Sequence, residues 1–132
     1  MMPGETNLSN LLCSMQPVLR QGEYVFCSIS HQENRYSNLD PVCLFREDEG
    51  LTLILEREQA DAVSLSYTSV FCMITLSIHS SLEAVGFLAA ITGKLADHNI
   101  SVNPISAYYH DHLFVPAVRA QEAMELLQEF SK

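Results

Sequence analysis

The sequence of 132 residues predicts an α+β fold in which antiparallel sheets carry helices on one face. Short apolar runs that alternate between two faces occur in both halves of the chain, as expected for β-strands. Other segments repeat their apolar residues at helical spacing. Because both kinds of element occur within a chain of this length, we expect one compact unit or two small modules that share a core.

The first half is expected to form a short helix, a strand, a hairpin and a second short helix. Leucines after Asn7 or Ser9 recur at helical spacing, and Pro17 limits the end of that helix. The run Tyr24 to Ile29 suits a strand that is covered on both faces. A polar loop follows, and after it come the hairpin strands and the second helix, at Val42 to Phe45, Leu51 to Leu55 and Glu56 to Val63.

The second half opens with a strand from Phe71 to Ile78 that has one fully apolar face. Ser80 and Glu83 have the spacing of a capping box, so we expect the next helix to begin there. Asn99 is the candidate for the left-handed residue that ends this helix, because asparagine tolerates a positive φ better than most residues.

The rest of the second half is expected to form two strands and a final helix. The first strand runs from Ile100 to Tyr108 and changes phase at Asn103-Pro104, where a bulge would absorb the slip. A turn at His110-Asp111-His112 leads to the second strand, Leu113 to Val118, in which Pro116 indicates an edge position. The helix at residues 119–130 has an apolar face formed by Ala123, Leu126, Leu127 and Phe130.

The element order of the second half, β-α-β-β-α, is one strand short of a split β-α-β sandwich of ferredoxin type. No room is left for another strand after Phe130. Either the sheet ends there, or a strand of the first half, such as Tyr24 to Ile29, completes it. We favour the second arrangement, which interlocks the two halves, because the second half alone would bury too little apolar surface.

Charge and sequence pattern exclude two classes of partner, nucleic acid and membrane. The net charge of −9 opposes binding to nucleic acid, because a polyanion would be repelled. The N-terminus lacks a basic start followed by an apolar core, and no apolar run approaches the roughly 20 residues of a membrane span. The four cysteines form no C-x-x-C pair. We therefore expect a reduced, cytoplasmic protein that binds neither nucleic acid nor membrane.

Four segments together resemble a known family. They are SSLEAVGF at 80–87, NISVN at 99–103, YYHDHLFVP at 108–116 and EGLTL at 49–53. The combination resembles the small bacterial proteins built from two ACT-type modules, in which the C-terminal module is similar to the regulatory modules of aspartate kinase. This resemblance implies two ferredoxin-like modules, at residues 1–66 and 67–132.

The resemblance also implies a noncatalytic module that binds a small molecule, often an amino acid, and that needs no cofactor. ACT modules commonly pair, so a homodimer is expected. Their ligands contact the loop from the first strand into the first helix and the facing second strand, which here are His79 to Phe87 and Ile100 to Tyr108. The implied ligand-binding residues in and beside these segments are Ser80, Ser81, Leu82, Val85, Gly86, Phe87, Asn103, Ile105, Ser106, Tyr109, His110 and His112.

Physical reasons also favour ligand binding at the segment His79 to Phe87, between the strand and the helix. N–H groups at a helix N-terminus suit a carboxylate, Gly86 allows close approach, and Ser80 and Ser81 add hydroxyl groups. In the alternative, the serines only cap the helix and Gly86 only packs against the sheet.

The segment His110-Asp111-His112 supports a second hypothesis. Two imidazoles and a carboxylate suit zinc, although no third fixed ligand is evident outside the segment. The alternative function is therefore a small metal-dependent or acid-base enzyme. Two other interpretations remain for these histidines. They contact a ligand or an interface, or they lie in a solvated turn that is only structural. His79 beside Ser80 is the nearest approach to a nucleophile with a base, and adjacency in sequence does not supply the geometry of catalysis.

Overall fold

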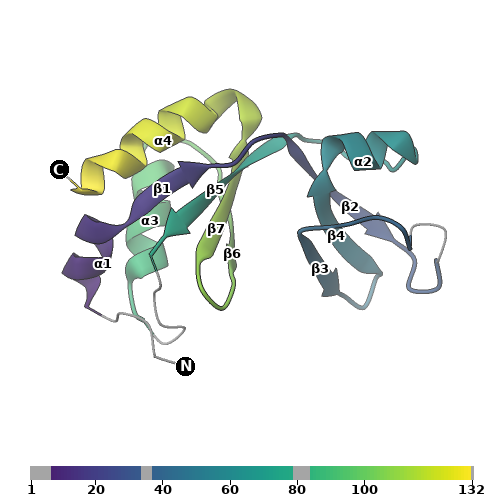
Figure 1. The fold of residues 1–132 in the computed structure, drawn as a ribbon, viewed down its shortest axis with the longest axis horizontal. Coiled ribbons are helices and arrows are strands. Elements are labelled where there is room, and N and C mark those ends of the chain that lie inside the picture. Colours follow the sequence, from purple (N-terminus) through teal and green to yellow (C-terminus); the bar gives the residue numbers. More distant parts are fainter. Residues whose placement is uncertain (1–6, 34–36, 79–83, 132) are drawn as a thin grey trace. The chain divides into compact units, whose positions relative to one another are not determined.

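The computed structural model describes residues 7–33, 37–78 and 84–131. These residues form two compact units (Figure 1). Unit 1 contains the described residues of 1–21 and of 72–132, and unit 2 contains those of 22–71. The chain thus leaves unit 1 after Gln21 and returns to it at Cys72. The expected division into 1–66 and 67–132 differs from this one mainly in where the first 21 residues belong.

Unit 1 is a sheet covered by helices on one face. Its strands are β1 (Gln16–Leu19), β5 (Phe71–Ser77, whose first residue lies in unit 2), β6 (Asn103–Ser106) and β7 (Asp111–Pro116), in the order β1-β5-β7-β6. Its helices are α1 (Leu8–Ser14), α3 (Phe87–Ala96) and α4 (Ala120–Gln128), with 3₁₀ turns at Ala117–Arg119 and Glu129–Ser131. This is the strand order of a ferredoxin-like fold in which β1 serves as the last strand.

The core of unit 1 follows from the alternation of its strands. Ile74 and Leu76 of β5, with Leu113 and Val115 of β7, point to the same face and are fully buried. Buried residues of all three helices pack onto that face: Leu11, Phe87, Ile91, Leu95, Ala123, Leu126 and Leu127. The helices therefore lie on one side of the sheet, as the sequence predicted.

The strand that completes the sheet comes from the first half, but it is not Tyr24 to Ile29. Residues 16–19 form β1, which pairs antiparallel with β5 from Gln16↔Ser77 to Leu19↔Ile74. Because β1 contacts a single neighbouring strand, Pro17 can occupy it without breaking a ladder on both sides. Helix α1 ends at Ser14, before Pro17 as predicted, and Pro17 itself lies in the edge strand β1.

Unit 2 is smaller and has a single described helix. The strands β2 (Tyr24–Ile29), β3 (Cys43–Arg46) and β4 (Leu51–Glu56) are followed by α2 (Arg57–Ala62). They form the order β3-β4-β2, and Tyr24 also pairs with Phe71. The predicted hairpin and second helix are confirmed within one residue at each end. The buried core of unit 2 consists of Val25, Cys27, Leu53, Leu55 and Ala60.

Helix α3 begins at Phe87 and not at the predicted capping box. Gly86 precedes it with φ +89°, a left-handed conformation that cannot continue a right-handed helix. Ser80 and Glu83 lie outside the described residues. The predicted end is confirmed, because Asn99 has φ +59° and the N–H of Ile100 donates to the carbonyl of Leu95.

The hairpin after α3 also differs from the expectation. β6 is short and pairs regularly with β7, from Asn103↔Phe114 to Ser106↔Asp111, so no bulge occurs at Pro104. Ile100 instead packs in the core before the strand begins. β7 already starts at Asp111 and lies between β5 and β6. The turn is therefore residues 107–110, and Pro116 ends an inner strand instead of occupying an edge.

Candidate functional site

Three of the predicted ligand-binding residues lie outside the described residues: Ser80, Ser81 and Leu82. The same holds for His79, at the start of the predicted loop. Val85 is 84% exposed, whereas Phe87 is 3% exposed and packs in the core of unit 1. The side chain of Phe87 is therefore part of the core and is not available to a ligand.

The N-terminus of α3 keeps the feature that motivated the prediction. Gly86 is its N-cap residue and has no side chain that could accept a hydrogen bond from the first turn. The first N–H groups of a helix lack partners within the helix, and the helix dipole favours negative charge beside them. Binding of a carboxylate at this end stays a prediction.

The hairpin of β6 and β7 brings several other predicted residues together. Ile105 pairs with His112, and Asn103 pairs with Phe114 and donates from Nδ2 to its carbonyl at 3.5 Å. Ile105, Asn103 and His112 share one face of the sheet. Ser106 pairs with Asp111 and points to the other face.

The turn of this hairpin carries the other two predicted residues. Its backbone is closed by a bond from the N–H of Ala107 to the carbonyl of His110 at 3.0 Å. The rings of Tyr108 and Tyr109 contact each other edge to face, and Tyr109 is exposed. His110 is half-buried at the end of the turn.

Two residues that the sequence analysis missed connect His112 to β1. The Nε of Arg20 donates to the Oγ1 of Thr75 at 3.0 Å, and this same oxygen lies 3.0 Å from the Nδ1 of His112. Thr75 is 1% exposed, and Arg20 follows β1 directly. We call Arg20, Thr75 and His112 the polar triad. It could not be seen in the sequence, because it depends on β1 lying beside β5.

His110 contacts Ile78, the residue that follows β5. Its Nδ1 lies 3.2 Å from the carbonyl oxygen of Ile78, so this nitrogen carries the proton and donates. The rings of His110 and His112 are 6.4 Å apart between centroids. The two imidazoles thus lie beside the last residues of β5, where the predicted loop begins.

Burial lowers the pKa of His112, and the nearby His110 and Arg20 lower it further. The carboxylate of Asp111 acts in the opposite direction. His112 is therefore neutral at pH 7. In this state one ring nitrogen carries the proton and the other can accept a hydrogen bond.

The contact between the Thr75 hydroxyl and the His112 imidazole also bears on the alternative that the protein is an enzyme. A hydroxyl beside an imidazole has the form of a nucleophile with its base, but the buried Thr75 hydroxyl offers almost no surface to a substrate. The donation from Arg20 also withdraws electron density from that oxygen. In the part of the chain that the structure describes, no group of three or more His, Cys, Asp or Glu side chains is placed to hold a metal.

None of the helices in residues 7–33, 37–78 and 84–131 combines the length and the apolar character that crossing a membrane requires. The four cysteines are free, and Cys27 is buried in the core of unit 2, where desolvation raises the pKa of its thiol. This thiol thus behaves as a small apolar core residue.

Solved structures with the same fold cover most of this chain. A Vibrio cholerae protein of unknown function, described as a possible transport protein, is 49% identical with a TM-score of 0.86, over 95% of this chain and 96% of that protein. The ligand-free regulatory subunit of Thermus thermophilus aspartate kinase is 7% identical with a TM-score of 0.63, over 88% and 96% of the two chains. E. coli aspartokinase III, solved with aspartate and ADP, is 12% identical with a TM-score of 0.62, over 86% of this chain and 32% of the enzyme.

Comparison with sequence families identifies the modules. One ACT-domain family matches residues 3–79, which is more than half of the chain, and a second matches residues 68–129. No curated protein matches the sequence. The strand order of unit 1 and the aspartate kinase structures agree with these matches. The chain therefore belongs to the ACT-domain family and is built from two ACT modules.

Proposed function

We propose that this protein is a noncatalytic regulatory module that binds a free amino acid beside the end of β5, in unit 1. ACT domains generally bind small molecules, so the class of function follows from the family. The choice of an amino acid rests on the polar groups around β5. The residues that we assign to the site are Arg20, His110 and His112, with Asn103 and Ile105 on the neighbouring strand and Gly86 at the start of α3.

The polar triad is the observation that carries the proposal. Arg20 uses its Nε on Thr75, and its two terminal nitrogens have no ion-pair partner among the described residues. His112 contacts Thr75 through Nδ1, which leaves its Nε2 for a ligand. A planar guanidinium is a strong donor to a carboxylate, and a protein with a net charge of −9 needs such local donors to hold one.

His110 complements these donors with an acceptor. Because its Nδ1–H donates to the carbonyl of Ile78, the other ring nitrogen, Nε2, is the one that can accept a hydrogen bond. An α-ammonium group is a donor that fits this nitrogen. Carboxylate donors and an ammonium acceptor on one strand end match the two charged groups of an amino acid.

The structural relatives support the same class of ligand. The E. coli aspartokinase III structure contains aspartate, and the T. thermophilus protein is the regulatory subunit of an aspartate kinase. The part with the fold of this chain is 32% of the E. coli enzyme and 96% of the T. thermophilus subunit. A free-standing pair of ACT modules with an amino-acid site would act as a sensor.

A thermal-shift screen against the twenty amino acids tests the proposal. A ligand that binds only the folded state raises the Tm in proportion to the logarithm of its concentration above Kd. We expect at least one amino acid to do so, and its methyl ester, which lacks the carboxylate, to have no effect. If none of the twenty raises the Tm, or if the methyl ester is as effective, the amino-acid assignment is wrong.

We also propose that two chains pair, and the edge strand β3 supports this. Val42, Leu44 and Phe45 are all about half exposed or more, and an edge strand carries unpaired N–H and C=O groups that another chain can bind. Sedimentation velocity should give the mass of a dimer for the wild type and of a monomer for Leu44→Lys. A wild-type monomer would contradict pairing.

A further inference from the structure

A row of four residues crosses the sheet of unit 1 through the polar triad. Val18 of β1 is paired with Thr75 of β5, whose Oγ1 lies 3.0 Å from the Nδ1 of His112. His112 is paired in turn with Ile105 of β6. Residues that lie directly opposite on neighbouring strands point to the same face of a sheet. The four side chains therefore share one face, with two polar residues in the middle and an aliphatic residue at each end. We call them the cross-strand row.

The cross-strand row lies on the face of the sheet that is opposite to the helices. Ile74 and Leu76 flank Thr75 in β5 and point into the core, so Thr75 points away from it. Val18 is 36% exposed, and Ile105 is partly exposed. Directly opposite side chains have Cβ atoms about 4.5–5.5 Å apart. Each aliphatic residue of the row thus adjoins a member of the polar triad and keeps surface that a ligand can contact.

Arg20 reaches this row from the end of β1. Its backbone N–H donates to the carbonyl of Met73 at 2.9 Å, which extends the pairing of β1 with β5 by one residue. Its Nε donates to the Oγ1 of Thr75 at 3.0 Å. Two bonds to one strand thus fix the guanidinium beside β5, so a carboxylate that binds it also lies at β5.

We propose that the amino-acid site selects a ligand with an aliphatic side chain, which packs against Ile105. The inference rests on the proposed function and adds the class of amino acid. With its carboxylate at Arg20 and its ammonium group at His110, the ligand lies across β5 and β7. The next strand in the sheet is β6 (Figure 1). Its residue Ile105, opposite His112, then receives the side chain.

The charges on this face oppose a charged side chain. The α-carboxylate of the ligand already uses the guanidinium of Arg20. Among the described residues of β1, β5, β6 and β7, none that points to this face is Asp, Glu or Lys. Asp111 is 7% exposed and points to the other face, because it is two residues from the core residue Leu113. An acidic side chain would therefore lack a cation, a basic one would lack a carboxylate, and either would lose hydration against Ile105.

Calorimetric titration of the full-length protein with leucine, asparagine, aspartate and lysine tests the class of ligand. Leucine and asparagine both branch at Cγ and are similar in size, so they differ mainly in polarity. We expect leucine to bind at least tenfold more tightly than aspartate or lysine, whose charged groups lack partners on this face. Leucine should also bind more tightly than asparagine.

Two variants at the ends of the cross-strand row locate the side chain of the ligand. Ile105→Thr keeps a β-branched residue on the edge strand β6 and replaces apolar surface with a hydroxyl. It should lower the ratio of leucine affinity to asparagine affinity at least threefold. The matched control Val18→Thr makes the same kind of change at the β1 end of the row and should leave this ratio unchanged.

Three results would overturn the inference. They are the absence of leucine binding, tighter binding of asparagine, aspartate or lysine than of leucine, and an unchanged affinity ratio in Ile105→Thr. The thermal-shift screen separates these failures from failure of the proposed function. If none of the twenty amino acids raises the Tm, the amino-acid site itself is wrong, whereas a rise with charged or polar amino acids alone contradicts only the aliphatic class.

Discussion

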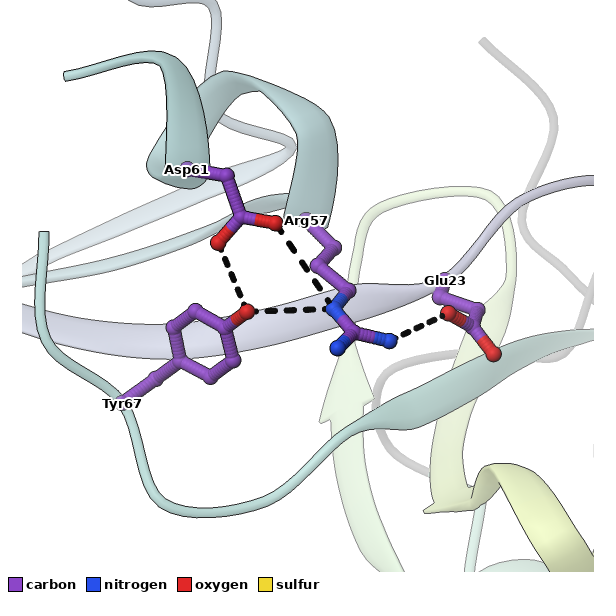
Figure 2. Close-up of polar contacts among 4 residues, drawn as sticks. All are labelled: Glu23, Arg57, Asp61 and Tyr67. Carbon is purple, nitrogen blue, oxygen red and sulfur yellow. Dashed lines mark hydrogen bonds and ion pairs between the residues drawn. The ribbon is translucent and has the colours of Figure 1, made fainter. Parts of the chain in front are cut away.

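The two units have related strand orders but bury very different cores. In unit 1, helices α1, α3 and α4 all contribute side chains to one apolar cluster, which buried residues of the central strands β5 and β7 complete. In unit 2, α2 covers the sheet mainly with Ala60. An exposed polar clamp joins Arg57 and Asp61 of α2 to Tyr67 and to Glu23, the residue before β2 (Figure 2). Unit 1 is therefore stabilised by burial. Unit 2 relies more on close backbone packing and on surface hydrogen bonds, which makes it easier to perturb locally.

The largest effect is expected in the core of unit 1. Leu76→Ala removes a fully buried side chain of β5 and should lower the free energy of unfolding by about 2–5 kcal/mol, because it loses transfer free energy and leaves a cavity. Urea denaturation measures the change. Val118→Ala, at a site that is 92% exposed, serves as the control and should stay within about 0.5 kcal/mol. Equal losses in the two variants would contradict the comparison.

A pair of glycine substitutions contrasts the two units directly. A Cβ at Gly50 would lie 2.5 Å from the carbonyl oxygen of Ile29, so Gly50→Ala must displace backbone in unit 2 and should destabilise by about 1–3 kcal/mol. Gly93 lies in α3 with nothing within 4 Å of its Cβ position. Gly93→Ala should stabilise by up to about 1 kcal/mol, because alanine favours a helix. Thermal unfolding of both variants tests the signs, and a stable Gly50→Ala variant would show that the hairpin is less tightly packed than described.

The lowered pKa of His112 predicts a pH dependence for unit 1. Below its ordinary value of 6.5 the unfolded chain binds a proton that the folded chain resists. The contribution of His112 to stability is thus complete above pH 6.5 and is lost as the pH falls from there toward the folded pKa. Urea titrations at several pH values should show this loss in the wild type and a smaller one in His112→Gln. An NMR titration in which the ring of His112 protonates above pH 6.5 would contradict it.

The smallest effect is expected at the clamp of unit 2. Tyr67→Phe removes the hydroxyl that joins Arg57 to Asp61 and should cost less than about 1 kcal/mol, since exposed hydrogen bonds exchange readily with water. Hydrogen exchange should nevertheless accelerate at Ser64 and Leu65. If exchange there does not change, the clamp does not hold the segment that follows α2.

The parts of the fold that depend on local pattern were predicted from the sequence. The hairpin at β3 and β4 follows from alternation around a charged turn, and Asn99 ends α3 because its side chain tolerates a positive φ. The capping box misplaced the start of α3, because the φ of Gly86 outweighs the spacing of Ser80 and Glu83. Local signals predict an element reliably only where no nearby residue imposes another conformation.

The parts that depend on distant pairing could not be predicted. β1 is four residues long and contains Pro17, and its partner β5 lies more than fifty residues away, so nothing in its own pattern marks it as a strand. Arg20 and Thr75 meet only because of that pairing. The polar triad, which carries the proposed function, therefore follows from the topology, whereas His110 and His112 were already visible as candidates.

The most direct test of the amino-acid site is calorimetric titration of three proteins with the amino acid that gives the largest thermal shift. The variants Arg20→Gln and Arg46→Gln each remove one exposed cation, the first beside Thr75 and the second at the end of β3 in unit 2. We predict that Arg20→Gln weakens binding at least tenfold and that Arg46→Gln matches the wild type. Equal affinity in all three proteins would show that the polar triad does not bind the carboxylate, and the proposed site would be wrong.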